Sequence, residues 1–196
     1  MERQVRDFNP GGSNLSLNFI ETKLSGAFII EPEFLTDERG FFARTCCRKE
    51  FEQLGLDSDW VQCNISYNQR KGTLRGMHYQ VEPFAEAKLV RCTTGAIYDV
   101  IIDLRSDSKT YRQWVAAELS AENRKMIYIP QGFAHGFQTL VDNSEIFYQM
   151  SAFYAPECAR AVRWNDPQFE IQWPEAERTI SAKDQTIADF EGAEGP

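Results

Sequence analysis

The sequence predicts an all-β protein, because it consists mainly of short alternating stretches separated by turn residues. The clearest stretch is 96–105, AIYDVIIDLR, in which Tyr98, Val100, Ile102 and Leu104 alternate with their neighbours. A period of two indicates a strand that is buried mainly on one face. Many short strands with few helices are typical of a sandwich or barrel, and the jelly roll is one member of that group. We therefore expect an antiparallel jelly-roll barrel with a few short helices.

Seven further stretches read as strands, and short turn signals separate them. In chain order they are GAFII, DWVQCNIS, TLRGMHYQ, AKLVRCTT, KMIYI, GFAHGFQTLV and EIFYQMSAFY. The turn candidates are Asp37 to Gly40, Lys71-Gly72, Gly95, Pro130 to Gly132 and Asp142-Asn143. The stretch CRKEFEQLGL predicts a helix, with Phe51 and Leu54 one turn apart and Gly55 as its stop. A second short helix is expected to begin at Ser181.

A single domain accounts for the 196 residues, which are enough to bury a sizeable core. Residues 1–20 contain NPGGSN and little periodicity, so we expect an N-terminal extension and one domain over residues 21–196. No apolar run is long enough to cross a bilayer, and the first residues lack the apolar core of a secretory signal. Five cysteines without framework spacing fit free thiols in a reducing compartment. These features predict a cytoplasmic protein with no membrane partner.

The net charge of −8 argues against a nucleic-acid partner, since no long basic stripe is present to neutralise phosphates. An anionic small molecule needs only a few local cations, and Arg75, Lys88 and Arg91 lie in one short region. The alternative is that these three side chains are solvated surface charges.

Four polar side chains are expected to enter the barrel interior from four different strands. The chain has two histidines, His78 and His135, and both lie in strand-like stretches. The alternation groups His78 with Leu74, Gly76 and Gln80, His135 with Phe133, Phe137 and Thr139, Lys88 with Val90 and Cys92, and Tyr148 with Ile146 and Met150. Polar groups that converge in a mostly apolar cavity are typical of ligand sites in small barrels. For each residue alone, the alternative is a core side chain with one satisfied hydrogen bond.

Two spacings resemble the sequence motifs of the cupin superfamily, in which many barrels bind a metal. Gly72 precedes His78 in the first motif, and PQGFAH ends on His135 in the second. Metal-binding cupins have His-x-His in the first motif, whereas this chain has Gln80 at the second of those positions. With two histidines in the chain, a site of three histidines and a glutamate cannot form. We therefore expect no metal and no cofactor, and acid–base chemistry by side chains alone.

Ten segments occur together in a particular order over roughly residues 22–190. They are DERGFF (37–42), QCNIS (62–66), GTLRGMHYQ (72–80), AKLVRC (87–92), YDVIIDLR (98–105), LSAEN (119–123), IPQGFAHGF (129–137), EIFYQMSAFYAPE (145–157), VRWNDP (162–167) and SAKD (181–184). In this order they resemble the dTDP-4-dehydrorhamnose 3,5-epimerase family. Each segment alone is a weak signal, whereas the combination is highly specific.

The resemblance implies a cupin-like jelly roll that forms a homodimer with exchanged N-terminal strands. It also implies a substrate, a 4-keto-6-deoxyhexose carried on thymidine diphosphate (dTDP). The C4 ketone acidifies the hydrogens on C3 and C5, so one base can epimerise either carbon through an enolate. The base removes a proton from one face of the ring, and an acid returns a proton to the other face.

For the catalytic residues, the resemblance implies His78 as the general base and Tyr148 as the general acid. It implies that Asp184 accepts a hydrogen bond from His78, which fixes the tautomer of the imidazole and stabilises the imidazolium. Lys88 is implied to stabilise the enolate oxygen.

Two of these assignments have competitors in the sequence. Asp184 also fits a Ser-x-x-Asp capping box that begins at Ser181. Tyr154 lies six residues past Tyr148 on the same expected strand face, so spacing alone does not choose between the two tyrosines. The resemblance favours Tyr148.

For substrate binding, the resemblance implies Arg39, Arg44, Gln62, Asn64, Arg75, His135 and Lys183. Arg39 is implied to reach the substrate of the partner subunit, and arginine suits a diphosphate because its planar fork donates two hydrogen bonds at once. The chain departs from the family at Arg44, where a glutamate is common, and at Ala159, where an acidic residue is often seen. The change at Arg44 reverses the charge near the nucleotide site.

These residues leave more than one function open. The leading one is a cofactor-independent isomerase that converts dTDP-4-dehydro-6-deoxyglucose to dTDP-4-dehydrorhamnose by 3,5-epimerisation. Close alternatives are epimerisation of a single carbon and 3,4-ketoisomerisation of a related nucleotide sugar. A further alternative is a non-catalytic cupin that binds sugar nucleotides. A metal-dependent cupin dioxygenase is disfavoured by the histidine count.

Overall fold

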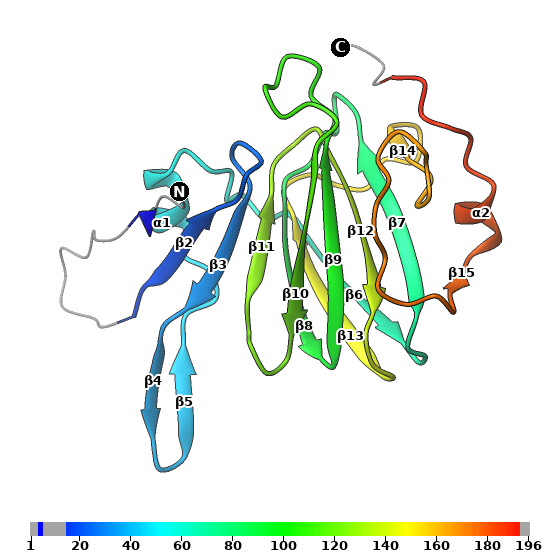
Figure 1. Cartoon of the computed structure of the whole chain (residues 1–196). Coiled ribbons are helices and arrows are strands. Elements are labelled where there is room, and N and C mark those ends of the chain that lie inside the picture. The colour runs from blue at the N-terminus through cyan, green and yellow to red at the C-terminus, as the bar shows by residue number, and fades with distance from the viewer. Residues whose placement is uncertain (1–3, 6–14, 193–196) are drawn as a thin grey trace.

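A computed structural model describes residues 4–5 and 15–192, in which two antiparallel sheets face each other across a shared core (Figure 1). The seven-stranded sheet has the order β1 (Gln4–Val5), β2 (Leu17–Glu21), β3 (Phe28–Pro32), β11 (Met126–Ile129), β8 (Lys88–Thr94), β13 (Ser144–Met150), β6 (Gln62–Asn68). The six-stranded sheet has the order β10 (Trp114–Ser120), β9 (Ala96–Asp103), β12 (Phe133–Thr139), β7 (Thr73–Gln80), β14 (Ala159–Ala161), and β15 (Thr179–Ile180) pairs parallel with β7.

A separate hairpin and two short helices complete the described elements. The hairpin consists of β4 (Phe34–Asp37) and β5 (Gly40–Ala43), and the helices are α1 (Arg48–Gln53) and α2 (Ala182–Gln185). Both helices lie where the sequence predicts them. The prediction of an all-β, antiparallel jelly-roll barrel with a few short helices is confirmed. No helix within residues 4–5 and 15–192 is long and apolar enough to cross a membrane.

The barrel begins earlier in the chain than expected. Strand β2 pairs with β3 over its whole length, with Leu17 opposite Pro32 and Glu21 opposite Phe28. Residues 17–20 of the expected N-terminal extension therefore belong to the seven-stranded sheet. Most of the remaining extension, residues 1–3 and 6–14, lies outside the described residues.

The core between the two sheets is built from β-branched and aromatic residues of facing strands. Val90 of β8 and Ile146 of β13 pack against Ile101 of β9 and Phe137 of β12, and all four are almost fully buried. Such residues favour strands because their side chains pack well on a pleated surface. This central cluster fills one part of the barrel and leaves the polar residues described below to line the rest.

The outer face of the six-stranded sheet is also buried, contrary to the expectation for β9. Val100 and Ile102 pack against Phe169 and Trp173, which belong to the chain that follows β14. This C-terminal segment runs back over the sheet (Figure 1). The prediction that β9 is buried mainly on one face is wrong, because a period of two cannot show that a later segment covers the second face.

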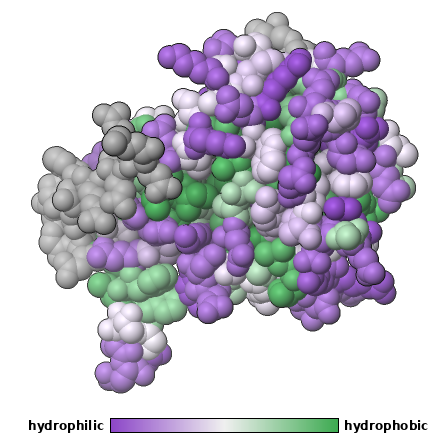
Figure 2. Space-filling view, viewed as in Figure 1, coloured by the Kyte–Doolittle hydropathy of each residue, from purple (hydrophilic) through white to green (hydrophobic). Residues whose placement is uncertain are grey.

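The hairpin of β4 and β5 projects from the two sheets (Figure 1). Phe34 and Phe41 stack edge-to-face across it, with ring centroids 4.8 Å apart. Phe42 on the same hairpin is 67% exposed. Figure 2 shows a hydrophobic band where the hairpin leaves the body and a hydrophilic tip. The hairpin thus presents apolar side chains that this chain alone does not cover.

Candidate active site

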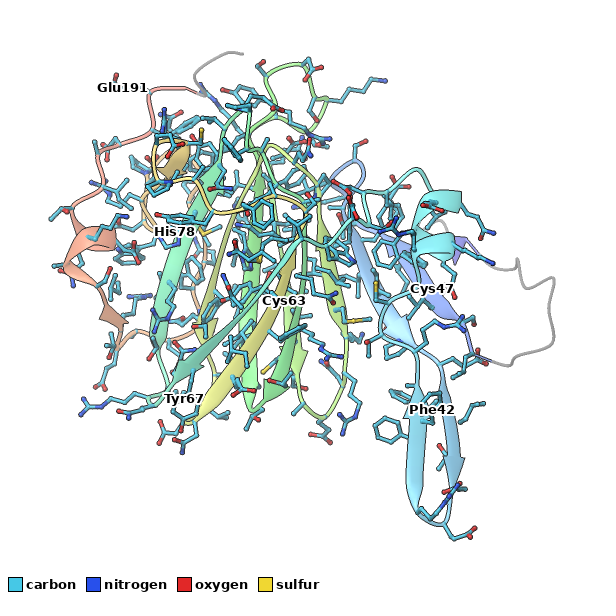
Figure 3. The ribbon with its side chains drawn as sticks, turned by 180° about the vertical axis from the view of Figure 1, so that it is seen from behind. Phe42, Cys47, Cys63, Tyr67, His78 and Glu191 are labelled. Carbon is cyan, nitrogen blue, oxygen red and sulfur yellow. The ribbon has the colours of Figure 1, made fainter. Side chains whose placement is uncertain are left out.

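A cleft of about 780 Å³ lies between the two sheets and is lined by strands of both and by α2. It brings together most of the residues expected from the sequence, namely Gln62, Asn64, Arg75, His78, Lys88, His135, Tyr148, Lys183 and Asp184. In Figure 3, His78 lies on β7 in the body of the molecule, whereas Phe42 lies on the separate hairpin.

Strand β7 presents both Arg75 and His78 to the cleft because it contains a bulge. His78 pairs with His135 and Arg75 pairs with Phe137, so β7 has one more residue than β12 between these two pairs. An extra residue shifts the alternation of a strand by one position. Leu74 therefore packs in the outer cluster, and the prediction that it shares a face with His78 is wrong. Gln80 does line the cleft with His78, as predicted.

Glycine is required at the bulge because the two strands approach closely there. A β-carbon on Gly76 would lie 2.4 Å from the α-carbon of Gly136, and Gly76 has a φ of +127°. A β-carbon on Gly136 would lie 2.7 Å from the carbonyl oxygen of Arg75. The two glycines therefore allow the backbone shape that turns Arg75 and His78 to the same side.

The imidazole of His78 is held by the carboxylate of Asp184. Nε2 of His78 lies 2.8 Å from Oδ1 of Asp184, and the His78 side chain is 47% exposed whereas that of Asp184 is 7% exposed. Burial alone would raise the pKa of Asp184, but hydrogen bonds from His78, Ser181 and the Gly76 backbone lower it below its usual value. An ionised Asp184 accepts a hydrogen bond from Nε2–H, so Nδ1 is left as the basic nitrogen.

Both interpretations of Asp184 apply at once. Ser181 caps α2, because its hydroxyl oxygen accepts a hydrogen bond of 3.1 Å from the Asp184 backbone N–H. In a complete capping box the side chain of the third helical residue reaches back to the cap. Here the carboxylate of Asp184 instead contacts His78, so the cap positions the helix and the carboxylate remains available to the imidazole.

Asp166 holds together the two ends of the segment that carries α2. The Asp166 carboxylate accepts a hydrogen bond of 2.8 Å from the backbone N–H of Gln168 and one of 2.6 Å from that of Phe190. Asp166 is 1% exposed. The two ends of segment 166–190 are therefore held together at one buried residue, with Asp184 between them.

Tyr148 enters the cleft from β13, in the opposite sheet from His78. Its ring packs edge-to-face on His135, with centroids 6.0 Å apart. Burial and the nearby charge of Asp99 raise the pKa of Tyr148 far above its usual range, against the effect of a hydrogen bond with Ser66. The phenol is therefore protonated at neutral pH and can donate a proton.

Tyr154 does not continue the strand of Tyr148, contrary to expectation. Strand β13 ends at Met150, and Tyr154 is 60% exposed at the rim of the cleft, where its backbone N–H donates to Gln62. Of the two tyrosines, Tyr148 is the less exposed one, since it is partly buried against the central core cluster.

Two carboxylates that were not predicted from the sequence, Glu86 and Asp99, lie near Lys88. The Lys88 ammonium lies 3.1 Å from Glu86 and donates to the His78 carbonyl oxygen at 3.4 Å. Asp99 is fully buried, and its Oδ2 lies 2.8 Å from Nε2 of His135. Burial raises the pKa of Asp99, whereas the charges of His135 and Lys88 oppose that rise. Asp99 shares the alternation of Ile97 and Ile101, and this pattern in the sequence could have predicted that its carboxylate points into the barrel.

Of the three neighbouring cations, two line the cleft and one does not. Arg75 and Lys88 lie in the cleft, whereas Arg91 sits on the other face of β8, 5.2 Å from the Phe147 ring centroid. Lys88 and Arg91 are an odd number of residues apart, so an alternating strand sends them to opposite faces.

Arg39 and Arg44 lie outside this chain's cleft. Arg39 is at the hairpin turn, 84% exposed, and pairs with Asp37. The Arg44 guanidinium lies 2.6 Å from the Glu50 carboxylate of α1 and donates to the Leu15 carbonyl oxygen. The positive charge at Arg44 is thus matched by a carboxylate within the same chain.

Gln80, at the position of the second metal-binding histidine of cupins, secures a loop. Its amide nitrogen donates to the carbonyl oxygens of Phe84 and Phe153, and its oxygen accepts from the Ala155 N–H at 2.7 Å. In the described part of the chain, no three His, Cys, Asp or Glu side chains gather so that they could hold a metal.

Comparison with known proteins agrees with this site. The sequence model of the dTDP-4-dehydrorhamnose 3,5-epimerase family matches residues 21–192. The chain belongs to this family. The resemblance inferred from the ten segments is therefore confirmed, and so is the isomerase class of the protein.

Members of the epimerase family are similar over most of the chain. The dTDP-4-dehydrorhamnose 3,5-epimerase of Shigella flexneri is 43% identical over 86% of this chain and 93% of its own length. The crystal structure of that enzyme from Bacillus anthracis, with TDP and pyrophosphate bound, has a TM-score of 0.86 and 40% identity, and covers 89% of this chain and 100% of its own. A 3'-monoepimerase from Streptomyces bikiniensis in complex with dTDP-quinovose has a TM-score of 0.80 and 31% identity, covering 86% and 85%.

Proposed function

We propose that this chain epimerises C3 and C5 of dTDP-4-dehydro-6-deoxyglucose to give dTDP-4-dehydrorhamnose. The observation that carries the proposal is the placement of a base and an acid on facing walls of one cleft. His78, backed by Asp184, comes from one sheet, and the protonated Tyr148 comes from the other. Inversion of a carbon requires removal of a proton on one face of the ring and delivery on the other.

The reaction begins at His78. Nδ1 takes the proton from the carbon beside the ketone, the C–H bond breaks, and its electrons form the enolate. The imidazolium is stabilised by the ionised carboxylate of Asp184, 2.8 Å away. Tyr148 then gives its phenolic proton to the same carbon from the opposite face, and the enolate returns to the ketone. Solvent restores both side chains to their starting protonation states.

Lys88 is suited to the negative charge that develops on the C4 oxygen. Its ammonium is nearly buried and is fixed by Glu86 and the His78 carbonyl oxygen, so it needs little reorganisation when the enolate forms. A preorganised donor at a developing oxyanion contributes on the order of 3–4 kcal/mol, by analogy with lost oxyanion-hole donors.

The remaining polar residues of the cleft would hold the nucleotide part of the substrate. Arg75 and Lys183 supply positive charge for the diphosphate, and Gln62, Asn64 and His135 supply hydrogen bonds. Arg75 is prepared for this task, because its Nε donates to Asn68 at 2.8 Å and so orients the guanidinium.

We further propose that the chain forms a homodimer through exchanged N-terminal strands. Phe42 on the hairpin and Ile65 on β6 are 67% and 63% exposed, which is unusual for side chains of this size unless they contact a partner. Arg39, at the tip of the same hairpin, would then reach the cleft of the partner subunit, as the family resemblance implies.

Incubation with dTDP-4-dehydro-6-deoxyglucose in deuterium oxide tests the proposed function. We expect deuterium at both C3 and C5 and the product dTDP-4-dehydrorhamnose by NMR. His78→Ala should abolish exchange, and undiminished exchange in that variant would overturn the assignment of the base. Tight binding of the sugar nucleotide by the wild-type protein without any exchange would instead support a non-catalytic binding protein.

Epimerisation of a single carbon is the second candidate, favoured by the similarity to the 3'-monoepimerase. It predicts deuterium at C3 alone, with C5 unlabelled, in the same experiment. A product in which the carbonyl has moved to C3 would indicate a 3,4-ketoisomerase.

A further inference from the structure

We propose that two side chains outside the cleft, Asp166 and Gln168, position Asp184 for the epimerisation. Both hold the backbone of Phe190, near the end of the described chain. The inference rests on the proposed function, in which the Asp184 carboxylate prepares the base. Neither Asp166 nor Gln168 lines the cleft, so their effect on the reaction has to pass through the segment that carries Asp184.

The hydrogen bonds that shape α2 are local. The side chains of Ser181, Gln185 and Thr186 hydrogen-bond to backbone groups of residues 180–184. These bonds hold the helix together, but they do not attach it to the barrel. A helix of four residues is too short to be stable alone in water. Its place beside His78 therefore depends on what anchors the chain on either side of it.

The chain before α2 is anchored by β15. Strand β15 pairs parallel with β7, and Ile180 lies opposite Leu74 in that pairing (Figure 1). Ile180 also packs against the buried residues on the outer face of the six-stranded sheet. One end of the helix is thus fixed to β7, the strand that carries His78.

The chain after α2 is anchored at Phe190. The backbone N–H of Phe190 donates to the Asp166 carboxylate at 2.6 Å, and the carbonyl oxygen of Phe190 accepts from the side-chain amide of Gln168. We call these two bonds the clasp. The Phe190 ring is 7% exposed and packs on Phe169, with centroids 5.4 Å apart. Residues 181–189, which include α2, therefore lie between two anchors.

Both oxygens of the Asp166 carboxylate are used. The side chain is buried, and one oxygen accepts from the backbone N–H of Gln168 at 2.8 Å while the other accepts from Phe190. The side chain of asparagine has only one acceptor oxygen. Asp166→Asn therefore leaves one of the two N–H donors facing an NH₂ group, at almost unchanged side-chain volume.

Loss of the clasp should let α2 leave the barrel for part of the time. Each time it does, the imidazole of His78 loses its carboxylate partner. A hydrogen bond to a charged group corresponds to a factor of roughly 10- to 100-fold in an equilibrium, so we expect kcat of Asp166→Asn to fall by about tenfold. The KM should rise by a smaller factor, because Lys183 is the one proposed nucleotide-binding residue on this segment.

Asp189→Asn is the matched control. It makes the same change one residue before Phe190, at a carboxylate that is 58% exposed and pairs with Arg163. Exposed ion pairs contribute little to stability, so kcat of Asp189→Asn should stay within about twofold of the wild-type value.

Hydrogen–deuterium exchange of the backbone measures the clasp without any substrate. Mass spectrometry should show faster exchange over residues 181–190 in Asp166→Asn than in the wild-type protein, because this segment opens more often. Asp189→Asn should exchange as the wild-type protein does. The amides of β7 should be unchanged in both variants.

A double-mutant cycle separates positioning from general damage to the barrel. In the Asp184→Asn protein the clasp has no carboxylate to position. Asp166→Asn should therefore lower kcat by less than about twofold in that background, against about tenfold in the wild-type background. Gln168→Ala removes the other bond of the clasp and should show the same pattern with a smaller loss. It keeps the test decisive where Asp166→Asn does not fold.

Each part of the inference has a result that contradicts it. Wild-type exchange over residues 181–190 in Asp166→Asn would contradict the clasp itself. Wild-type kcat in both clasp variants, or an equal fall in kcat in both backgrounds, would overturn its role in the reaction. Failure of the wild-type protein to turn over the keto sugar would overturn the proposed function instead, and hydrogen exchange would still decide whether Asp166 holds the segment.

Discussion

Asp184 contacts His78 across 106 positions of the sequence, with Oδ1 of the carboxylate 2.8 Å from Nε2 of the imidazole. The carboxylate is nearly buried and the imidazole is half exposed, so Asp184 fixes a ring whose other nitrogen can reach the cleft. This pair links the last short helix of the chain to the middle of β7.

Replacement of Asp184 by asparagine should cost activity without removing His78. We expect Asp184→Asn to lower kcat on the order of 10³- to 10⁴-fold, because the imidazole loses both its tautomer and the charge that stabilises its protonated form. The pKa of Asp184 is lowered, so the wild-type carboxylate stays ionised at neutral pH, and raising the pH should not rescue the variant. Ser181→Ala is the matched control. It removes the helix cap, at about 1 kcal/mol of stability, and should lose far less activity.

Lys88→Met should slow the first proton transfer. Loss of the cation at the enolate oxygen should lower the rate of deuterium incorporation itself by about 10²- to 10³-fold. Glu86→Gln is the matched control, because it removes the charge of the partner 3.1 Å away and keeps the ammonium. Unchanged deuterium incorporation by Lys88→Met would show that Lys88 does not contact the developing oxyanion.

Asp99→Ala should destabilise the barrel more than Asp99→Asn. Asp99 is fully buried and pairs with His135, so alanine leaves a buried imidazole without its partner. Removal of one member of a buried pair costs about 3–5 kcal/mol in the free energy of unfolding. Asparagine can still accept the hydrogen bond and should cost less. Urea unfolding at one protein concentration measures both, and equal losses would contradict the role of this hydrogen bond.

Hybrid dimers test whether Arg39 acts in the partner subunit. Arg39→Ala and His78→Ala homodimers should both be weakly active or inactive. After the two variants are mixed and exchanged, each hybrid dimer has one site with an intact His78 and an intact Arg39 from the other subunit. We expect recovery to about a quarter of the wild-type rate. No recovery, with hybrid formation verified by mass spectrometry, would place the effect of Arg39 within its own chain.

Acid stability should depend on Asp103. Burial would raise the pKa of this carboxyl, but hydrogen bonds from Arg105, Ser108 and Thr110 lower it below its usual value. A carboxyl whose pKa falls on folding adds stability that is present above its unfolded pKa and is lost as the pH drops through the folded pKa. The loss therefore begins near pH 4 and continues below it.

Asp103→Asn should be less stable than wild type at pH 7 by about 2–3 kcal/mol. The difference should shrink as the pH falls from about 5 to 3, since the wild-type carboxyl becomes protonated. Thermal unfolding across this range measures the difference, and a gap that stays constant with pH would contradict the ion pair as its source.

The sequence predicted which residues line the cleft better than it predicted their surroundings. The ten segments assigned His78, Tyr148, Lys88 and Asp184 to one family, and all four line one cleft. Alternation correctly placed Tyr148 with Ile146, because the pairing of β13 is regular from Ile146 to Met150. The alternation of a strand is a short-range feature, which a sequence pattern describes well.

Three features depended on contacts that no local pattern contains. The bulge that turns both Arg75 and His78 to the cleft arises where β7 meets β12, far along the chain. The pairing of Asp99 with His135 joins β9 to β12, a contact that the alternation within β9 does not show. The carboxylate of Glu86 lies just before β8, in a stretch outside every predicted strand, and contacts Lys88.

Segment 166–190, whose ends are held together at Asp166, is synthesised after the walls of the cleft. Every strand that lines the cleft is complete by residue 161, but the carboxylate that contacts His78 follows only at Asp184. On the ribosome, a chain that has made the walls of its cleft still lacks the carboxylate partner of His78. In the proposed mechanism, the capacity to enolise a keto sugar is therefore completed last, with the docking of a four-residue helix.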